Sequence, residues 1–503
     1  MRCVRCPGAS AKLNAKQGVS EGEPVLSTDH LFSSPGYKDN KTLIAIWGKW
    51  PSCPHPLSVE ANRLEEMEGS TATHPDLPLP SPAASSLRPL VIEGLAHHRV
   101  KQVATGTSHL LFLTDVGKVY VFGYNFYGQL GLGTTLPFAH TLRPLQRLPV
   151  IQQIAAGDAH SIALSDQGEV FTWGCGDAVG FSDGLPRATP TLLDFAPPPE
   201  DPANDAANDT NNERIDERSR SQLTEHSPGM KRIAACGRQS VAITSSAFGT
   251  LEWVYGWGEL PMGVWEATPR PLLMFQAGMG NRLEEIALGR HFGLVRTGRG
   301  EVFSWGDGSY GELGRPSEVQ QTATSLFQSV QDGNDSGSVL SAALVHLPSG
   351  AGKMDSIAAG GRHALMLGHD GRVWAMGDNT AGQCGVNVAE LQLTQPKCVA
   401  SPSVSSWEAK GLRVAAGGRH SACITQDHRL LVWGHASHHK LIYTATPAAV
   451  PPPSMTPGVS VRSGLKECSV KPRLVFSLLH RKVTDVVLGE DFTVVVTGEG
   501  EGK

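Results

Sequence analysis

Histidines at a fixed place in a recurring motif are the residues of this chain with the clearest chemical potential. A Gly-x-x-His motif ends in each of four histidines: His109, His160, His363 and His420. A neutral imidazole can serve as a general acid or base near neutral pH. The same place in three further copies is taken by Ser240, Phe292 and Phe492, so the motif does not require a proton carrier. We therefore interpret the histidines as structural and expect their rings to bond backbone groups.

Each of these motifs opens a longer unit that has the pattern of an antiparallel hairpin. In residues 415–434, small residues run into Gly417, an alternating apolar and polar run follows, and a polar turn leads to a second run ending in Trp433-Gly434. Period-two alternation on both sides of a turn predicts two paired strands. Six further copies begin at residues 103, 154, 233, 286, 357 and 486.

The spacing of the hairpins predicts the fold. A strand-rich unit that repeats about every 50 residues, with no helical pattern, is typical of a β-propeller. The copy at 486–500 lacks its second strand, whereas residues 42–48 (TLIAIWG) look like that strand alone. We expect Val494–Thr497 to pair with Leu43–Trp47, because this pairing would cover two open strand edges. The prediction is an all-β fold: a single seven-bladed β-propeller, its ring closed by an N-terminal strand that pairs with the C-terminal repeat.

Three motifs recur in phase with the hairpins, namely Gly-x-x-His, an Asp-x-Gly turn, and Gly-Gln-Leu-Gly at 128–131 with variants at 311–314 and 382–385. In this combination the chain resembles the regulator of chromosome condensation repeat family over residues 41–498. The resemblance implies a propeller that binds proteins, since the family includes guanine-nucleotide exchange factors of small GTPases and a chromatin-binding founder. Architecture follows from such a resemblance more directly than activity does.

The expected domain organisation is simple. Residues 1–40 carry no repeat signal and are predicted to be a flexible N-terminal segment, while residues 41–503 form the propeller. Two insertions, about 197–228 and 315–342, lengthen the spacing between repeats. Their polar composition cannot bury an apolar face, so we expect both to be disordered.

Composition excludes several function classes. A net charge of −5 argues against a nucleic-acid-binding face, and no apolar run reaches the roughly 18 residues of a membrane span. Nine scattered cysteines suit a reducing compartment. We expect an intracellular, cytoplasmic protein, with mitochondrial and nuclear locations left open, and a monomer.

No motif for covalent chemistry is present. The sequence contains no Gly-x-x-x-x-Gly-Lys-[Ser/Thr] phosphate loop and no nucleophile elbow in a strand–turn–helix context. His435, His438 and His439 lie together without a carboxylate or thiol beside them, so a solvated loop is expected there and not a metal site. We predict no chemical catalyst, no cofactor and no small-molecule substrate, with guanine-nucleotide exchange left open.

The predicted partners are proteins. Tyr124, Phe126 and Tyr127 crowd one loop (GYNFYGQLG) and are the candidate partner-binding residues, because aromatic side chains are enriched at interfaces. Three functions remain open. They are regulation or nucleotide exchange of a small GTPase, a non-exchanging scaffold subunit of a protein or organelle complex, and, third, chromatin binding.

Overall fold

The structure is a computed structural model. It describes residues 43–48, 90–92, 95, 99–134, 136–197, 229–244, 251–276, 281–315, 327–329, 342–386, 389–399, 410–437, 441–442 and 468–498. The chain divides into two units, Met1–Asp39 and Asn40–Lys503, and every described residue belongs to the second. The N-terminal segment predicted at 1–40 and nearly all of the insertion predicted at 197–228 lie outside the described residues.

Seven antiparallel sheets, here called blades 1 to 7, make up the described part of the chain. Blade 1 contains β3 (Val100–Thr105), β4 (His109–Thr114), β5 (Val119–Tyr124) and β6 (Phe138–Pro144). Blade 2 contains β7 (Ile151–Ala156), β8 (His160–Ser165), β9 (Val170–Gly174) and β10 (Arg187–Leu192). Blade 3 contains β11 (Met230–Cys236), β12 (Gln239–Thr244), β13 (Leu251–Glu259), β14 (Trp265–Gln276) and β18 (Phe327–Ser329).

The other four blades follow in chain order, except that the last uses both ends of the chain. Blade 4 contains β15 (Leu283–Leu288), β16 (Phe292–Thr297), β17 (Val302–Gly306) and β19 (Ala343–Leu344). Blade 5 contains β20 (Met354–Ala359), β21 (His363–Gly368), β22 (Val373–Asp378) and β23 (Gln392–Cys398). Blade 6 contains β24 (Gly411–Ala416), β25 (His420–Thr425), β26 (Leu430–His435) and β27 (Cys468–Leu474). Blade 7 contains β28 (Lys482–Leu488), β29 (Phe492–Gly498), β1 (Leu43–Gly48) and β2 (Leu90–Ile92).

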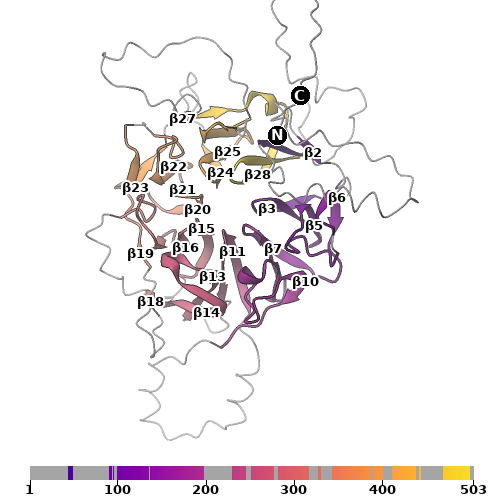
Figure 1. Ribbon diagram of the computed structural model, residues 1–503. Coiled ribbons are helices and arrows are strands. Elements are labelled where there is room, and N and C mark those ends of the chain that lie inside the picture. The colour runs from indigo at the N-terminus through magenta and orange to yellow at the C-terminus, as the bar shows by residue number, and fades with distance from the viewer. Residues whose placement is uncertain are drawn as a thin grey trace, which may run out of the picture. The chain divides into compact units, whose positions relative to one another are not determined.

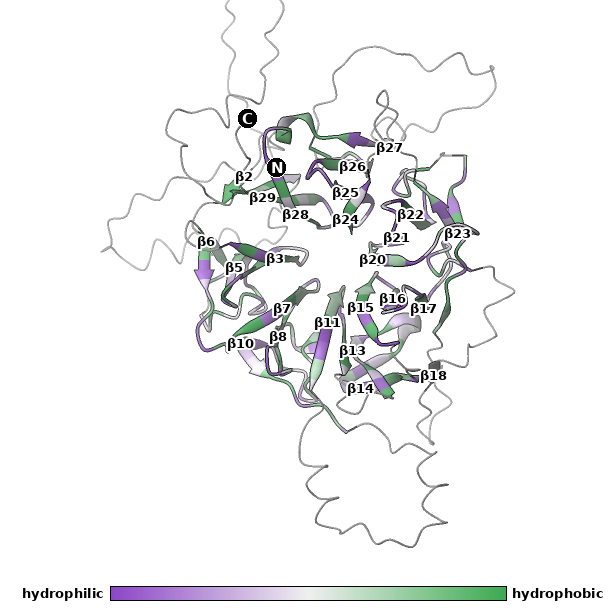
Figure 2. Ribbon diagram, turned by 180° about the vertical axis from the view of Figure 1, so that it is seen from behind, coloured by the Kyte–Doolittle hydropathy of each residue, from purple (hydrophilic) through white to green (hydrophobic). Residues whose placement is uncertain are grey.

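The blades form a closed ring around a central axis (Figure 1). The first strand of each blade is the innermost and contacts the first strand of the next blade, through to the contact of β28 with β3. Hydrophobic segments are spread over all the blades (Figure 2), and each buried cluster combines side chains from two neighbouring blades. The core therefore lies between the blades, so each blade is stabilised by its neighbours.

The predicted ring closure is confirmed. β1 pairs with β29 in antiparallel register, from Leu43 opposite Thr497 to Gly48 opposite Phe492. The other edge of β1 pairs with β2. Blade 7 is therefore assembled from the two ends of the propeller sequence, which leaves neither β1 nor β29 with an open edge.

One strand was not expected from the sequence. Within the insertion predicted at 315–342, residues Phe327–Ser329 form β18, which pairs with Leu273–Phe275 at the outer edge of β14. Blade 3 therefore has five strands, whereas each other blade has four.

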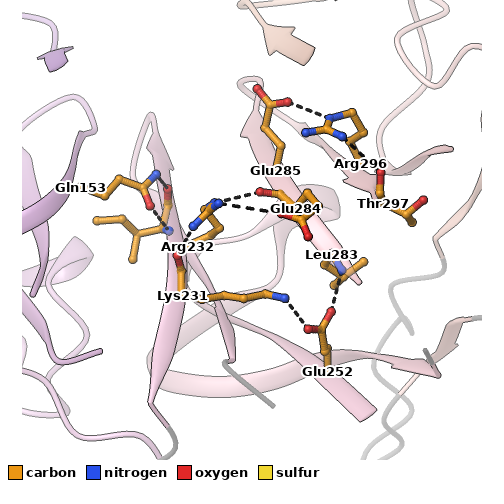
Figure 3. Close-up of polar contacts among 10 residues, drawn as sticks. Gln153, Lys231, Arg232, Glu252, Leu283, Glu284, Glu285, Arg296 and Thr297 are labelled. Carbon is orange, nitrogen blue, oxygen red and sulfur yellow. Dashed lines mark hydrogen bonds and ion pairs between the residues drawn. The ribbon is translucent and has the colours of Figure 1, made fainter. Parts of the chain in front are cut away.

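Polar side chains on the inner strands tie neighbouring blades together (Figure 3). The Gln153 amide donates to the carbonyl of Ile233 (2.8 Å) and accepts from its N–H (3.1 Å), so it bridges blades 2 and 3 as a peptide group would. Glu252 of blade 3 is fully buried, forms an ion pair with Lys231 and accepts from the N–H of Leu283 in blade 4 at 2.6 Å. A buried carboxylate is tolerated only with such partners.

Candidate docking face

The ring has two faces, defined by which connections emerge there. The loop face carries the Gly-x-x-His turns between the first and second strands of a blade and the connections between its third and fourth strands. The turn face carries the turns between the second and third strands and the connections from blade to blade. Because neighbouring strands run antiparallel, these two sets of connections lie at opposite ends of each blade. The candidate residues Tyr124, Phe126 and Tyr127 belong to the loop face.

Two buried amides fix the backbone of the loop that holds these aromatic residues. The Asn125 side chain donates to the carbonyl of Leu136 (3.0 Å) and accepts from the N–H of Leu130 (2.9 Å). The Gln129 side chain accepts from the N–H of Tyr127 (2.8 Å). Asn125 and Gln129 are 6% and 2% exposed. Their hydrogen bonds are shielded from water, and the loop is therefore a rigid platform.

The Gly-Gln-Leu-Gly motif also locks one blade to the next. The backbone carbonyl of Gln129 accepts hydrogen bonds from Ser161 Oγ (2.8 Å) and Trp173 Nε1 (2.8 Å), both in blade 2. Gln383 in blade 5 receives the same pair of bonds from blade 6. The motif is therefore structural, and its glutamine is not available to a partner.

The candidate residues form an aromatic patch with one neighbour, defined here as Tyr124, Phe126, Tyr127 and Leu136. The rings of Tyr124 and Phe126 are stacked, with centroids 5.6 Å apart, and the rings of Tyr124 and Phe138 meet edge-on at 4.7 Å. Phe126, Tyr127 and Leu136 are 51%, 54% and 53% exposed. The structure thus stacks two of the three predicted residues, Tyr124 and Phe126, while Tyr127 and Leu136 are exposed on the same loop. Sequence reasoning missed Leu136 because an isolated leucine carries no signal.

The loop fold itself does not require the two exposed rings. Blade 5 builds the same loop, with Asn379 and Gln383 in place of Asn125 and Gln129. Its residues at the positions of Phe126 and Tyr127 are Thr380 and Ala381. Since small side chains satisfy the architecture there, the aromatic residues of blade 1 are free to serve binding.

The Gly-x-x-His histidines are structural, as predicted, but their partners are side-chain hydroxyls rather than backbone groups. Each Nε2 lies within hydrogen-bond distance of a hydroxyl in the next blade: His109–Ser161 (2.9 Å), His160–Ser240 (2.7 Å), His363–Ser421 (2.8 Å) and His420–Thr493 (3.1 Å). Burial lowers the pKa of His109 to about 3 and those of His160 and His363 to about 4. These three rings are neutral at physiological pH and fully buried.

The residue at the histidine position matches what the next blade offers. Phe292 shares a buried cluster with Ala364 of blade 5, and Phe492 shares one with Leu110 of blade 1. Neither of these neighbours has a hydroxyl. The chain therefore uses histidine opposite serine or threonine and phenylalanine opposite an apolar residue.

Blade 3 departs from the predicted alignment, because Gln239, and not Ser240, occupies the histidine position. Gln239 lies opposite Gly258 in the strand pairing, just as each histidine lies opposite a glycine of the third strand of its blade. Cys236 occupies the position of the leading glycine. The turn has the usual length, since Gln239 follows Cys236 by three positions as His109 follows Gly106, but here Gly237 adopts a φ of 61°, in the left-handed region that favours glycine. The Gln239 amide donates to the carbonyl of Gly289 in blade 4 at 2.6 Å.

Two arginines on the loop face form ion pairs. Arg290 and Glu490 form an ion pair at 3.2 Å between the turns of blades 4 and 7. Arg238 pairs with Asp177 and lies over the ring of Trp265, 5.1 Å from its centroid. Trp265 is 42% exposed, which makes it a third exposed aromatic side chain on this face, after Phe126 and Tyr127. No repeat motif marks it in the sequence.

The described residues hold neither a metal-ion cluster nor a membrane-spanning helix. They contain no group of three or more His, Cys, Asp or Glu side chains arranged to hold a metal ion. His435 Nδ1 lies 2.8 Å from Ser437 Oγ, while His438 and His439 are outside the described residues. Among the residues that the structure covers, no helix is long and apolar enough to cross a membrane.

Comparison with known families agrees with this geometry. The family described as "Regulator of chromosome condensation (RCC1) repeat" matches residues 116–164, 299–367 and 370–424, and a second description of the same repeat matches 100–129, 151–178 and 355–383. The chain is a propeller of regulator of chromosome condensation repeats. The matched segments include the histidine turns and the Gly-Gln-Leu-Gly loops described above.

Individual relatives are distant. The human E3 ubiquitin-protein ligase HERC2 is 27% identical over 389 residues, which is 75% of this chain but 7% of HERC2. The ultraviolet-B receptor UVR8 of Arabidopsis thaliana is 27% identical over 361 residues, 70% of this chain and 69% of UVR8. The structure of Prp20p from Saccharomyces cerevisiae, studied for its binding to Gsp1p and histones, superposes with a TM-score of 0.60 over 92% of both chains at 19% identity, and this likeness concerns the fold.

Proposed function

We propose that this propeller binds a protein through the aromatic patch and that the partner is a small GTPase whose nucleotide exchange it regulates. The observation that carries the proposal is the half-exposure of Phe126 and Tyr127 on a loop whose backbone is fixed by Asn125 and Gln129. Exposed aromatic side chains on a rigid base lose little conformational entropy on binding and act as anchors.

The size of the effect follows from the exposed area. Each ring buries on the order of 100 Å² more in a complex, which at about 25 cal/mol per Å² is worth roughly 2–3 kcal/mol. Loss of both rings therefore weakens binding by on the order of a thousandfold. The rest of the loop face adds Trp265 and the paired arginines as a polar surround.

Relatives support a protein partner and leave its identity open. Prp20p binds Gsp1p and histones, and yeast RCC1 (Prp20) has been seen with Kap60 bound. Nucleotide exchange needs no covalent chemistry from the propeller, only a surface that favours the nucleotide-free partner.

The experiment is proximity labelling with a C-terminal fusion of the full chain, comparing wild type with Phe126→Ala/Tyr127→Ala. Leu185→Ala/Leu391→Ala is the matched control, because these leucines are 59% and 56% exposed on the loop faces of blades 2 and 5. We expect a small GTPase among the neighbours of the wild type and of the control, and its loss from the patch variant. An unchanged neighbour set in the patch variant would contradict the proposal.

A non-exchanging scaffold is the alternative that the fold favours, since a ring presents two broad rigid faces. The two functions differ in one measurement. A scaffold binds its partners through the patch and leaves GDP release from every GTPase unchanged.

A further inference from the structure

The turn face carries one exposed cation at the start of each of five consecutive inner strands. These side chains, here called the cation arc, stand directly before the first buried residue of blades 4, 5, 6, 7 and 1: Arg282, Lys353, Lys410, Lys482 and Arg99. All five are exposed. Blades 2 and 3 have Val150 and Gly229 at this position. The arc therefore spans five neighbouring blades near the central axis (Figure 1) and has one uncharged gap.

The backbone beneath the arc is fixed. The carbonyl of Lys353 accepts from the N–H of His369, and that of Lys410 from the N–H of Gln426, each at 2.9 Å. A Cβ built at Gly300 would lie 2.7 Å from Lys353 Cβ. The glycine of one blade's turn therefore makes room for the cation of the next blade, and the charged side chains start from a rigid rim.

The arc cations are not neutralised within the described part of the chain. None of the five side chains forms an ion pair with any described residue, whereas two acids on the same face are paired locally. Asp370 pairs with Arg372 at 2.5 Å within one turn, and Asp355 pairs with His369 at 3.0 Å. Five uncompensated cations on a rigid rim attract a polyanion although the whole chain has a net charge of −5.

Exposed apolar side chains lie on the same face as the arc. The connection from blade 6 to blade 7 includes the short 3₁₀ helix η6 (Phe476–Leu478), in which Leu478 is buried while Phe476 is 71% exposed. Leu479 on the same connection is 40% exposed, and Val116 in the turn of blade 1 is 51% exposed. Both connections belong to the turn face.

We propose that the cation arc is a second docking surface and binds an acidic, partly apolar segment of a partner protein. Acidic side chains of the segment lie along the arc, and an apolar one packs against Phe476. This partner is independent of the one proposed for the aromatic patch, because the two surfaces occupy opposite faces of the ring.

The chemistry of the arc favours a peptide over other anions. Three of its five members are lysines, which are flexible point charges and do not form the bidentate fork that fixes a compact phosphate. Exposed apolar side chains gain nothing from a phosphate backbone but do gain from a peptide. The exposed acidic residues Asp115 and Asp166 lie on the same face, directly after the second strands of blades 1 and 2, and the N–H of Asp115 donates to the carbonyl of Arg99. They would repel a flat anionic membrane yet leave room for a narrow segment along the arc.

The test is fluorescence anisotropy of the full chain with a labelled synthetic peptide of aspartate and glutamate that carries two phenylalanines. The arc variant is Lys353→Glu/Lys410→Glu. Its matched control is Arg143→Glu/Lys471→Glu, which alters two exposed cations on the outer strands β6 and β27 and changes the net charge equally. We expect the arc variant to bind about tenfold more weakly than the control, and binding by wild type to weaken with added salt. Equal melting temperatures verify that both variants fold.

Four outcomes would overturn the proposal. The first is no salt-sensitive binding of the peptide to wild type, and the second is equal affinity in the arc and control variants. The third is arc-dependent binding to phosphatidylserine vesicles that exceeds binding to the peptide, which would make a membrane the occupant. The fourth is peptide binding that begins only after residues 198–228 are removed. In that case the occupant is this chain's own insertion, whose stretch 200–213 contains five acidic residues and no basic one.

Discussion

Acidification from about pH 7 to pH 5 should destabilise this propeller because three buried histidines must remain neutral. Burial lowers the pKa of His109 from 6.5 to about 3 and those of His160 and His363 to about 4. The unfolded chain takes up protons near pH 6.5, whereas the folded chain does not. The stability is therefore complete above pH 6.5 and falls as the pH drops towards 4.

The magnitude follows from linkage. A histidine with a folded pKa of about 4 or lower removes about 2 kcal/mol of unfolding free energy between pH 7 and pH 5, so three remove about 5–6 kcal/mol. Glu312 acts in the opposite direction, because burial raises its pKa to about 6, and it returns about 1 kcal/mol. The loss of unfolding free energy that remains after this correction is comparable with the whole net stability of a typical protein, about 5–15 kcal/mol.

A residue pair that already occurs between blades 4 and 5 suggests the variant that tests this prediction. His363→Phe/Ser421→Ala copies the native pair of Phe292 and Ala364 and removes one titrating ring without leaving a hydroxyl unpaired. Urea unfolding should show that this variant loses about 2 kcal/mol less than wild type between pH 7 and pH 5. His369→Phe is the control, because His369 is 82% exposed, and it should retain the pH dependence of wild type. An equal loss in wild type and the double variant would refute the assignment.

Three further changes test the architecture. Removal of residues 1–48 deletes β1, whose four large apolar side chains are each at most 6% exposed. Because their burial is worth about 6–12 kcal/mol, circular dichroism of the truncated protein should show no cooperative melting. A sharp melting transition would contradict ring closure. Glu252→Gln breaks the buried pair with Lys231 and should cost about 3 kcal/mol in urea unfolding; a loss below about 1 kcal/mol would show that the pair is not effectively buried. Gly106→Ala places a Cβ 2.2 Å from the His109 ring and should cost about 1–3 kcal/mol, whereas Gly229→Ala, with nothing within 4 Å, should leave the melting temperature unchanged.

The architecture could be predicted from the sequence because it rests on local patterns. Period-two alternation and turn glycines recur in every blade, and the strand Leu43–Gly48 has the same pattern as the third strands elsewhere. The misalignment in blade 3 has a local cause. Gly237 looks like the leading glycine, but it is the residue after that position and adopts a positive φ, whereas Cys236 occupies the position of the leading glycine.

The surfaces were harder to predict, because they depend on relations between blades. Tyr124, Phe126 and Tyr127 stood out as a run of aromatic residues. Their exposure, however, depends on the loop backbone, which the side chains of Asn125 and Gln129 hold in place by hydrogen bonds. The cation arc gives no sequence signal, since its members are single charges separated by tens of residues, unlike the charge runs that mark polyanion sites. Only the closed ring brings them to one rim.

The central claim is tested most directly by the release of labelled GDP from a panel of small GTPases. Wild type and the Leu185→Ala/Leu391→Ala control should accelerate release from one GTPase, and Phe126→Ala/Tyr127→Ala should fail to do so while melting at the same temperature. Acceleration that survives in the patch variant would contradict the assignment of the aromatic patch. Unchanged release across the whole panel with wild type would contradict exchange itself.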